Sequence, residues 1–197
     1  MSESPKFERP TTPETGDENF TPEEKAALYL ERSQYNLEQL GKDRLTGLGN
    51  RMSFDRELER ELMLHGRGGQ DCSILFVDLD NFKQVNDSKG HLEGDRALQK
   101  VAEVLTHSVR GTDFVARFGG DEFYILLPQT DKEEAVNAGN KILNALNTDE
   151  VLSDFGIGAS IGVSSSSLST NPVELVHLAD VAAKKAKQSG KNRVEAS

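Results

Sequence analysis

Acidic residues occur at two points of the sequence where a purely structural role explains them poorly. Asp78 directly follows the apolar run 73–77, and the pair Asp121-Glu122 follows two glycines at the tip of an expected hairpin. A carboxylate at the end of a buried strand is costly unless it is paired. Two carboxylates about 4 Å apart repel by roughly 4 kcal/mol at an effective dielectric near 20, and a cation between them removes that penalty. Oxygen ligands without clustered histidines favour Mg²⁺, so these residues indicate a magnesium site.

Further polar residues indicate what such a site would bind. Lys83 and Lys187 could balance the charge of a triphosphate, and Gly119-Gly120 could let it approach the backbone. Asn86 and Asp95 carry groups that can hydrogen-bond the amide-and-amine edge of guanine. Taken singly, each residue has an ordinary explanation: solvated helix side chains for the lysines, a cap for Asn86 and a helix start for Asp95. Together they indicate a nucleotide site.

Hydrophobic patterning predicts the elements that must position these residues. The continuous apolar run 73–77 is typical of a central buried strand, and apolar runs on both sides of Gly119-Gly120 predict a β-hairpin whose turn needs positive φ. Asp131 and Asn171-Pro172 are expected helix starts. The resulting order predicts an α/β (α+β) fold with a mixed central sheet covered by helices. The expected helices cover 51–64, 81–87, 95–109, 131–146 and 171–190, with a polar loop over 88–94 and a further strand over 156–164.

The N-terminal region is expected to differ from the rest of the chain. Residues 1–20 are poor in aliphatic side chains, which predicts a disordered tail. Thr21, a proline and Glu24 form a capping-box pattern for a helix that Gly41 ends. Its apolar positions step by four and three over fewer than three heptads, so two interpretations stay open: a coiled-coil dimerisation segment, or a helix packed on the domain. The expected division is therefore a tail (1–20), a helix (21–41) and a main domain (42–197).

Length and composition restrict the class of protein. A chain of 197 residues with 36% hydrophobic content can bury one full-sized core. No apolar run approaches the roughly 18 residues of a membrane span, the polar first twenty residues do not resemble a signal peptide, and the single Cys72 suits a buried thiol. The net charge of −10 argues against a general nucleic-acid binder. We therefore expect a cytoplasmic protein with no membrane or nucleic-acid partner.

Four segments of the sequence resemble the motifs of a known family. Residues 119–123 (GGDEF) are the name-giving motif of the GGDEF family of bacterial diguanylate cyclases. Residues 43–51 (DRLTGLGNR) resemble its opening motif, and 77–87 (VDLDNFKQVND), with Gly90-His91 and Gly94-Asp95, resemble its central block. Ala179-Asp180 and 186–192 (AKQSGKN) resemble its closing block. The resemblance covers about residues 43–194.

The resemblance implies a palm-like nucleotidyl cyclase domain that joins two GTP molecules into cyclic di-GMP with release of pyrophosphate. In this pattern Asp78 and Asp121 bind Mg²⁺ (Mn²⁺ is the alternative ion), helped by Glu122 and the Leu79 carbonyl. The base belongs to the Asp121–Glu122 pair, and we favour Asp121. The other implied ligands serve the phosphates or the guanosine: Lys83, Arg117, Lys187 and Lys191 for the phosphates, and Asn86, His91 and Asp95 for the guanine or its ribose.

The resemblance also implies a dimer and feedback by the product. One domain has one guanine site and one metal site, whereas the product contains two nucleotides, so two GTP-loaded domains must face each other. Arg110 and Asp113 have the spacing of the family's inhibitory motif and are expected to bind cyclic di-GMP allosterically.

The sequence departs from the family at two positions without indicating a degenerate domain. Lys184 replaces a usual aromatic residue, and Lys191 replaces a usual arginine, but neither belongs to the metal site. The main alternative is a catalytically silent module that binds GTP or cyclic di-GMP and acts through a partner. A cyclase making a mixed adenine–guanine product would need different residues at the position that binds the base, and Asp95 argues against such an enzyme.

Overall fold

The computed structural model describes residues 21, 23–25, 27, 29, 30, 40–66 and 68–197. The chain comprises two units, residues 1–40 and 41–197. In the first unit the predicted capping box is confirmed: the Thr21 amide donates to Glu24 Oε2 (2.7 Å) and the Glu24 amide donates to Thr21 Oγ1 (3.2 Å). The predicted tail and most of the expected coiled-coil positions lie outside the described residues.

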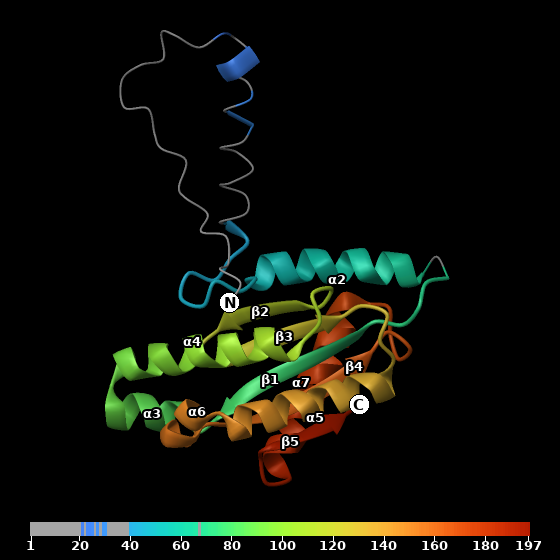
Figure 1. The fold of residues 1–197 in the computed structure, drawn as a ribbon. Coiled ribbons are helices and arrows are strands. Elements are labelled where there is room, and N and C mark those ends of the chain that lie inside the picture. Colours follow the sequence, from blue (N-terminus) through green and yellow to red (C-terminus); the bar gives the residue numbers. More distant parts are fainter. Residues whose placement is uncertain (1–20, 22, 26, 28, 31–39, 67) are drawn as a thin grey trace. The chain divides into compact units, whose positions relative to one another are not determined.

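The second unit is built on a five-stranded mixed sheet in the order β2-β3-β1-β4-β5 (Figure 1). The central strand β1 (Ser73–Asp80) is antiparallel to β3 (Glu122–Leu127) and to β4 (Gly158–Ser165). The edge strand β2 (Phe114–Gly119) is antiparallel to β3, and the other edge strand, β5 (Arg193–Ala196), is parallel to β4. The predicted hairpin, central strand and mixed sheet are confirmed.

Helices cover both faces of this sheet. Both faces are apolar, because successive apolar residues of β1 point to opposite faces. Leu75 and Val77 pack into one apolar cluster with α3, α4, α5 and α6, whereas Ile74 and Phe76 pack into a second cluster with α2 and α7. Figure 1 shows α4 and α5 in front of the sheet and α7 behind it. The helices are α2 (Arg51–His65), α3 (Phe82–Lys89), α4 (His91–Ser108), α5 (Lys132–Thr148), α6 (Glu150–Phe155) and α7 (Pro172–Gln188).

Local capping chemistry explains why two of the predicted helix starts are confirmed. Asp131 Oδ1 accepts from the Glu134 amide (2.9 Å) in a complete capping box at the start of α5. Asn171 Oδ1 accepts from the amides of Val173 and Glu174 at the start of α7. Each cap satisfies backbone donors that the first turn of a helix leaves unpaired.

The predicted polar loop over 88–94 and the helix start at Asp95 are wrong. Helix α3 continues to Lys89, and α4 already begins at His91, with Gly90 alone between them. Gly90 has a φ of 87°, which lets the chain pass from one helix to the next without a longer connection. Two elements were not predicted: α6, which is a short helix capped by Asp149, and β5, which exists only through pairing with β4.

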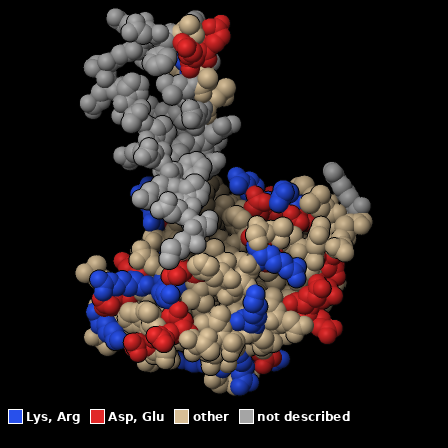
Figure 2. All heavy atoms as spheres, in the orientation of Figure 1, with Lys and Arg blue, Asp and Glu red and all other residues tan. Residues whose placement is uncertain are grey.

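The remaining composition-based expectations concern the surface and the thiol. Cys72 is buried, and burial raises the pKa of its thiol to about 11, as expected of an inert cysteine. Within the described part of the chain, no helix is long and apolar enough to cross a bilayer. On the face drawn in Figure 2, basic side chains are interspersed with acidic ones. The acidic residues that give the net charge of −10 therefore do not gather in a single patch on that face.

Candidate active site

The two acidic groups lie side by side at one end of the sheet. Asp78 on β1 is directly opposite Glu122 on β3, and the Leu79 amide donates to the Asp121 carbonyl (3.2 Å). This register follows from the hairpin, because β3 pairs with β1 on one side and with β2 on the other. The structure therefore brings the end of the buried strand and the tip of the hairpin together, as the sequence predicted.

Only one of the two carboxylate oxygens of Asp78 has a partner among the described residues. Its Oδ2 lies 2.6 Å from Lys187 Nζ, whereas Oδ1 is buried and has no hydrogen-bond partner among the residues that the structure describes. Burial raises the pKa of the Asp78 carboxyl, although the Lys187 ammonium acts in the opposite direction. Burial, and then the charges of Asp78 and Asp121, also raise the pKa of the Glu122 carboxyl. The site therefore has an excess of negative charge that a cation would stabilise.

These residues fit a magnesium ion as partial ligands. In the described residues no three acidic, histidine or cysteine side chains form a ready-made metal cluster. Mg²⁺ typically takes one or two carboxylates and completes its shell with water and substrate phosphates, so a partial set is what it requires. The free Oδ1 of Asp78 is the buried oxygen best suited to it.

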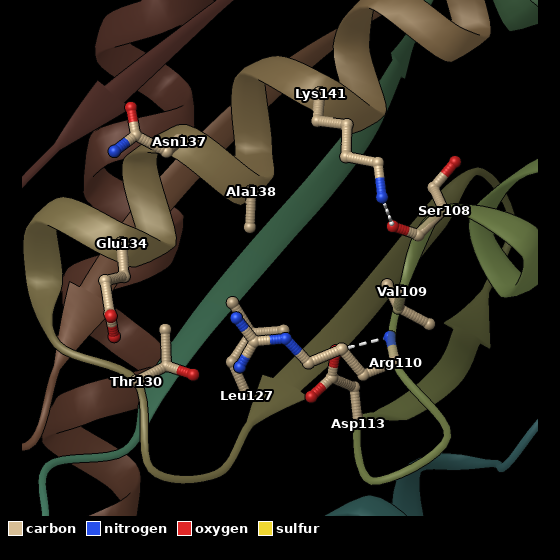
Figure 3. Close-up of a pocket in the computed structure, with 10 residues that line it drawn as sticks. All are labelled: Ser108, Val109, Arg110, Asp113, Leu127, Thr130, Glu134, Asn137, Ala138 and Lys141. Carbon is tan, nitrogen blue, oxygen red and sulfur yellow. Dashed lines mark hydrogen bonds between the residues drawn. The ribbon is translucent and has the colours of Figure 1, made fainter.

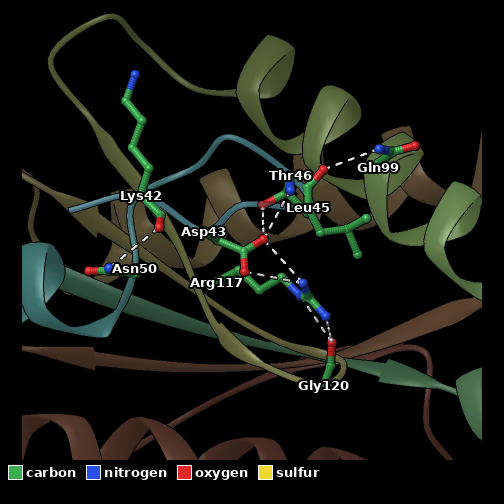
Figure 4. Close-up of polar contacts among 8 residues, drawn as sticks. All are labelled: Lys42, Asp43, Leu45, Thr46, Asn50, Gln99, Arg117 and Gly120. Atoms are coloured by element: carbon green, nitrogen blue, oxygen red, sulfur yellow. Dashed lines mark hydrogen bonds and ion pairs between the residues drawn. The ribbon is translucent and has the colours of Figure 1, made fainter. Parts of the chain in front are cut away.

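The glycine turn between β2 and β3 has the backbone conformation that the sequence predicted. Gly119 has a φ of 143° and Gly120 a φ of 54°. Arg117 braces this turn: its Nε and Nη2 donate to the Gly120 carbonyl (3.1 and 2.8 Å), and its Nη1 donates to Asp43 Oδ1 (3.1 Å; Figure 4). The side chain of Arg117 is only 11% exposed. Its role as a phosphate ligand stays a prediction, and in this structure its guanidinium holds the turn.

The expected guanine ligands gather around the junction of α3 and α4. Asn86 lies in α3, and His91 and Asp95 are exposed in the first turns of α4. The Asn86 amide packs against the bare backbone of Gly94: a Cβ on Gly94 would lie 2.0 Å from Asn86 Oδ1. The sequence analysis assigned Gly94 to a family motif but predicted no contact with Asn86, although the spacing of eight residues across Gly90 could have indicated one.

The lysines expected at the phosphates occupy three different environments. Lys83 is exposed in the first turn of α3. Lys187 pairs with Asp78. Lys191 lies in the turn that follows α7, and its Nζ donates to Asn81 Oδ1 (3.0 Å). Asp80 was also missed: its buried carboxylate accepts from the Asn192 amide (2.9 Å) and from Ser160, which ties this turn to the end of β1.

Comparison with known proteins now identifies the family. A family model described as diguanylate cyclase, GGDEF domain, matches residues 41–193. The chain belongs to the GGDEF family. It is 34% identical over 161 residues to the diguanylate cyclase DosC of Escherichia coli (strain K12), and 36% identical over 160 residues to the diguanylate cyclase DgcP of Pseudomonas aeruginosa.

Solved structures are similar in fold as well. The coiled coil and GGDEF domain of DgcB from Caulobacter crescentus, in complex with cyclic di-GMP, superposes with a TM-score of 0.76 at 30% identity. The match covers 88% of this chain and 96% of that one. The matched regions span 80% and 78% of this chain but only 35% of DosC and 23% of DgcP, so the curated relatives are much longer.

A pocket of the GGDEF domain lies at the opposite end of β2 from the glycine turn. It has a volume of about 320 Å³ and lies between the loop before β2 and helix α5 (Figure 3). Arg110 and Asp113 line it, together with Glu134, Asn137 and Lys141 of α5. The Arg110 amide donates to Asp113 Oδ2 (2.8 Å), whereas Asp113 Oδ1 is buried without a hydrogen-bond partner in the described region. The pocket thus offers a free buried acceptor beside two cationic side chains.

Proposed function

We propose that this chain is a diguanylate cyclase that condenses two GTP molecules into cyclic di-GMP and pyrophosphate. The observation that carries the proposal is the buried Oδ1 of Asp78, which has no partner among the described residues and lies beside the acidic glycine turn of a GGDEF-family domain. Phosphoryl transfer requires positioning and charge neutralisation more than covalent chemistry by the protein. A buried carboxylate oxygen that has no hydrogen-bond partner among the described residues suits a dication shared with a triphosphate.

The acidic residues divide the chemistry between metal binding and proton removal. Asp78, Asp121 and Glu122, with the Leu79 carbonyl, would hold Mg²⁺, for which Mn²⁺ is the alternative. The bound ion supplies charge neutralisation at the triphosphate. The Asp121–Glu122 pair accepts the proton of the attacking 3′-hydroxyl, and Asp121 is the assigned base because it directly follows the braced turn. Asp78 has no part in proton transfer in this assignment.

The basic and amide side chains orient the substrate. Asn86, with His91 and Asp95, hydrogen-bonds the guanine or its ribose, and the exposure of His91 and Asp95 beside Asn86 supports this role. Lys187 is 39% exposed, so its ammonium can leave Asp78 and contact a phosphate when a cation takes its place. Lys83 and Lys191 supply further positive charge, with Lys191 already oriented by Asn81.

The working unit in this proposal is a homodimer. Each domain has a single set of guanine and metal ligands, and the product requires two nucleotides in opposite orientation. The segment 21–40 is the proposed device that raises the local concentration of the second domain. The solved structure of Caulobacter crescentus DgcB comprises a coiled coil together with the GGDEF domain, which supports the assignment.

The Arg110–Asp113 pocket is the proposed feedback site for cyclic di-GMP. The Arg110 guanidinium can grip a phosphate or a guanine edge in forked geometry, and the free Asp113 Oδ1 can accept from guanine nitrogen donors. Since the pocket and the glycine turn lie at opposite ends of β2, inhibition would be allosteric, without competition for GTP.

Incubation of the full chain with GTP and Mg²⁺, followed by chromatography of the products, tests the proposed activity. We expect cyclic di-GMP and pyrophosphate, and we expect neither when Mg²⁺ is chelated. Recovery of unreacted GTP alone at high protein concentration would favour the silent binding module. That alternative has no structural observation in its favour, because Asp78 and the acidic turn are both intact.

A further inference from the structure

An aspartate outside the acidic site is connected to the glycine turn through Arg117. Asp43 lies in the loop that precedes α2, and its two carboxylate oxygens are 3.1 and 3.3 Å from Arg117 Nη1. The other nitrogens of the same guanidinium, Nε and Nη2, donate to the Gly120 carbonyl. The guanidinium thus bridges the carboxylate and the turn, as Figure 4 shows. Gly120 directly precedes Asp121, the assigned base.

The carboxylate of Asp43 is itself firmly held. Its Oδ1 accepts from the backbone amide of Thr46 (3.0 Å) and from Thr46 Oγ1 (2.6 Å). Burial alone would raise the pKa of the Asp43 carboxyl, but these hydrogen bonds and Arg117 lower it, so the carboxylate is ionised at neutral pH. Its charge is therefore available to orient the guanidinium.

The loop that carries Asp43 is docked on the same strand that leads into the turn. The Gly49 amide donates to the Val115 carbonyl (3.1 Å), and the Arg117 amide donates to the Gly49 carbonyl (2.8 Å). A side chain on Gly49 would clash with Phe114, since its Cβ would lie 2.5 Å from the ring. Asp43 and Arg117 therefore approach each other from two segments whose backbones are already bonded together.

The turn itself has little intrinsic preference for the conformation that it adopts. Both glycines have positive φ, and glycine visits this region and many others at similar cost. Two hydrogen bonds from an oriented guanidinium select one of these conformations. Without the carboxylate, Arg117 keeps its charge but loses the partner that fixes the direction of its fork.

We propose that Asp43 is a positioning residue for catalysis, which fixes the Gly119-Gly120 turn, and with it Asp121, through the guanidinium of Arg117. The catalytic role of Asp43 rests on the proposed cyclase function, whereas the effect of Asp43 on the conformation of the turn does not. Asp43 neither touches substrate nor binds metal in this scheme. Its loss is expected to reduce kcat and to leave KM for GTP nearly unchanged, because the guanine ligands lie on α3 and α4.

The variant Asp43→Asn tests this role, with Asp149→Asn as a matched control. Asp149 is similarly exposed (17% against 21%), accepts from a backbone amide three residues later (Leu152, 3.1 Å) and pairs with a cation (Lys100, 3.2 Å). It begins α6, away from the turn. Both variants lose one ion pair and keep a side-chain acceptor, so a purely structural role predicts the same behaviour in both.

We expect Asp43→Asn to lower kcat about tenfold, with KM changed less than about twofold, and Asp149→Asn to leave both constants unchanged. In the Arg117→Lys background, Asp43→Asn should lower kcat no further, because lysine lacks the fork that Asp43 orients. Equal kcat for wild type and Asp43→Asn would overturn the proposal. A tenfold loss that persists undiminished in the Arg117→Lys background would overturn it as well.

A nuclear magnetic resonance measurement separates this proposal from the proposed function. The backbone amide resonances of Gly119 and Gly120 should shift, and their order parameters should fall, in Asp43→Asn but not in Asp149→Asn. Unchanged glycine resonances in Asp43→Asn would refute the coupling whatever the activity. If the wild type makes no cyclic di-GMP, the proposed function fails, and the glycine resonances alone decide whether Asp43 sets the turn.

Discussion

Replacing Gly94 by alanine should impair GTP binding through a contact that the structure specifies. The new Cβ would lie 2.0 Å from Asn86 Oδ1, whereas carbon–oxygen contacts normally stay beyond about 3.3 Å. The Asn86 amide must therefore retreat by roughly 1.3 Å, which its flexible side chain can do without unfolding α4. If this amide makes two hydrogen bonds to guanine at about 0.5–1.5 kcal/mol each, KM for GTP should rise about 5- to 150-fold.

Initial rates measured over a range of GTP concentrations give this KM. Gly139→Ala is a matched control, since Gly139 is also a buried helical glycine, in α5, and its added Cβ would meet Val194 Cγ1 at 3.2 Å. Its KM should equal that of the wild type. A double-mutant cycle with Asn86→Ala isolates the contact: once the amide is gone, Gly94→Ala should have no further effect.

Two results would refute this reasoning. An unchanged KM in Gly94→Ala would mean that the position of the Asn86 amide is irrelevant to GTP. Additive effects of Gly94→Ala and Asn86→Ala would mean that the glycine acts through another group.

Four further expectations concern the metal, feedback, assembly and packing. Asp78→Asn should lower product formation by at least about 100-fold, because the dication loses an anionic ligand; its melting temperature should not fall, since the raised pKa of the Asp78 carboxyl means that its charge opposes folding at neutral pH. Near-normal turnover in that variant would show that the ligands are misassigned. Progress curves of the wild type should stall as cyclic di-GMP accumulates, whereas those of Arg110→Ala should continue from a similar initial rate; equal inhibition of both by added cyclic di-GMP would exclude the pocket. Deletion of residues 1–40 should make the specific rate depend steeply on protein concentration, and a truncated protein as active as the full chain at low nanomolar concentration would exclude this segment as the dimeriser. Gly162→Ala should cost about 1–3 kcal/mol or more in the free energy of unfolding, measured by denaturant titration, because its Cβ would lie 2.0 Å from the backbone oxygen of Ala179; an unchanged midpoint would contradict the close packing of α7 on β4.

Much of the fold was predictable because its signals are local. The buried strand β1 is a continuous apolar run, the hairpin turn needs two glycines, and Asp131 and Asn171 cap the helices that follow them. The boundary between α3 and α4 was not predictable in this way. Polar residues from 88 to 94 favour a loop, but the packing of α3 on α4 makes them helical, with one glycine as the junction.

The acidic centre of the site was predictable from residue types alone. A carboxylate after a buried strand and two carboxylates after a glycine turn are poorly explained by packing, so Asp78 and Asp121-Glu122 could be identified before their positions were known. The family motifs added His91, Arg117 and Lys191 to the residues expected to bind guanine or phosphate, and the structure places Lys187 directly against Asp78. Their roles toward GTP stay predictions.

Tertiary structure alone decided how these residues contact one another. Arg117 is separated from Asp43 by 74 positions, and the contact exists because the loop before α2 is bonded to β2, the strand that carries Arg117. Lys187 reaches Asp78 because α7 covers the face of β1 to which Asp78 points. The sequence by itself determined which groups are available for chemistry, since charge and local backbone preference belong to each residue. Which of them bind substrate and which hold the turn depends on strand order and helix placement, and these arise only when distant segments pack together.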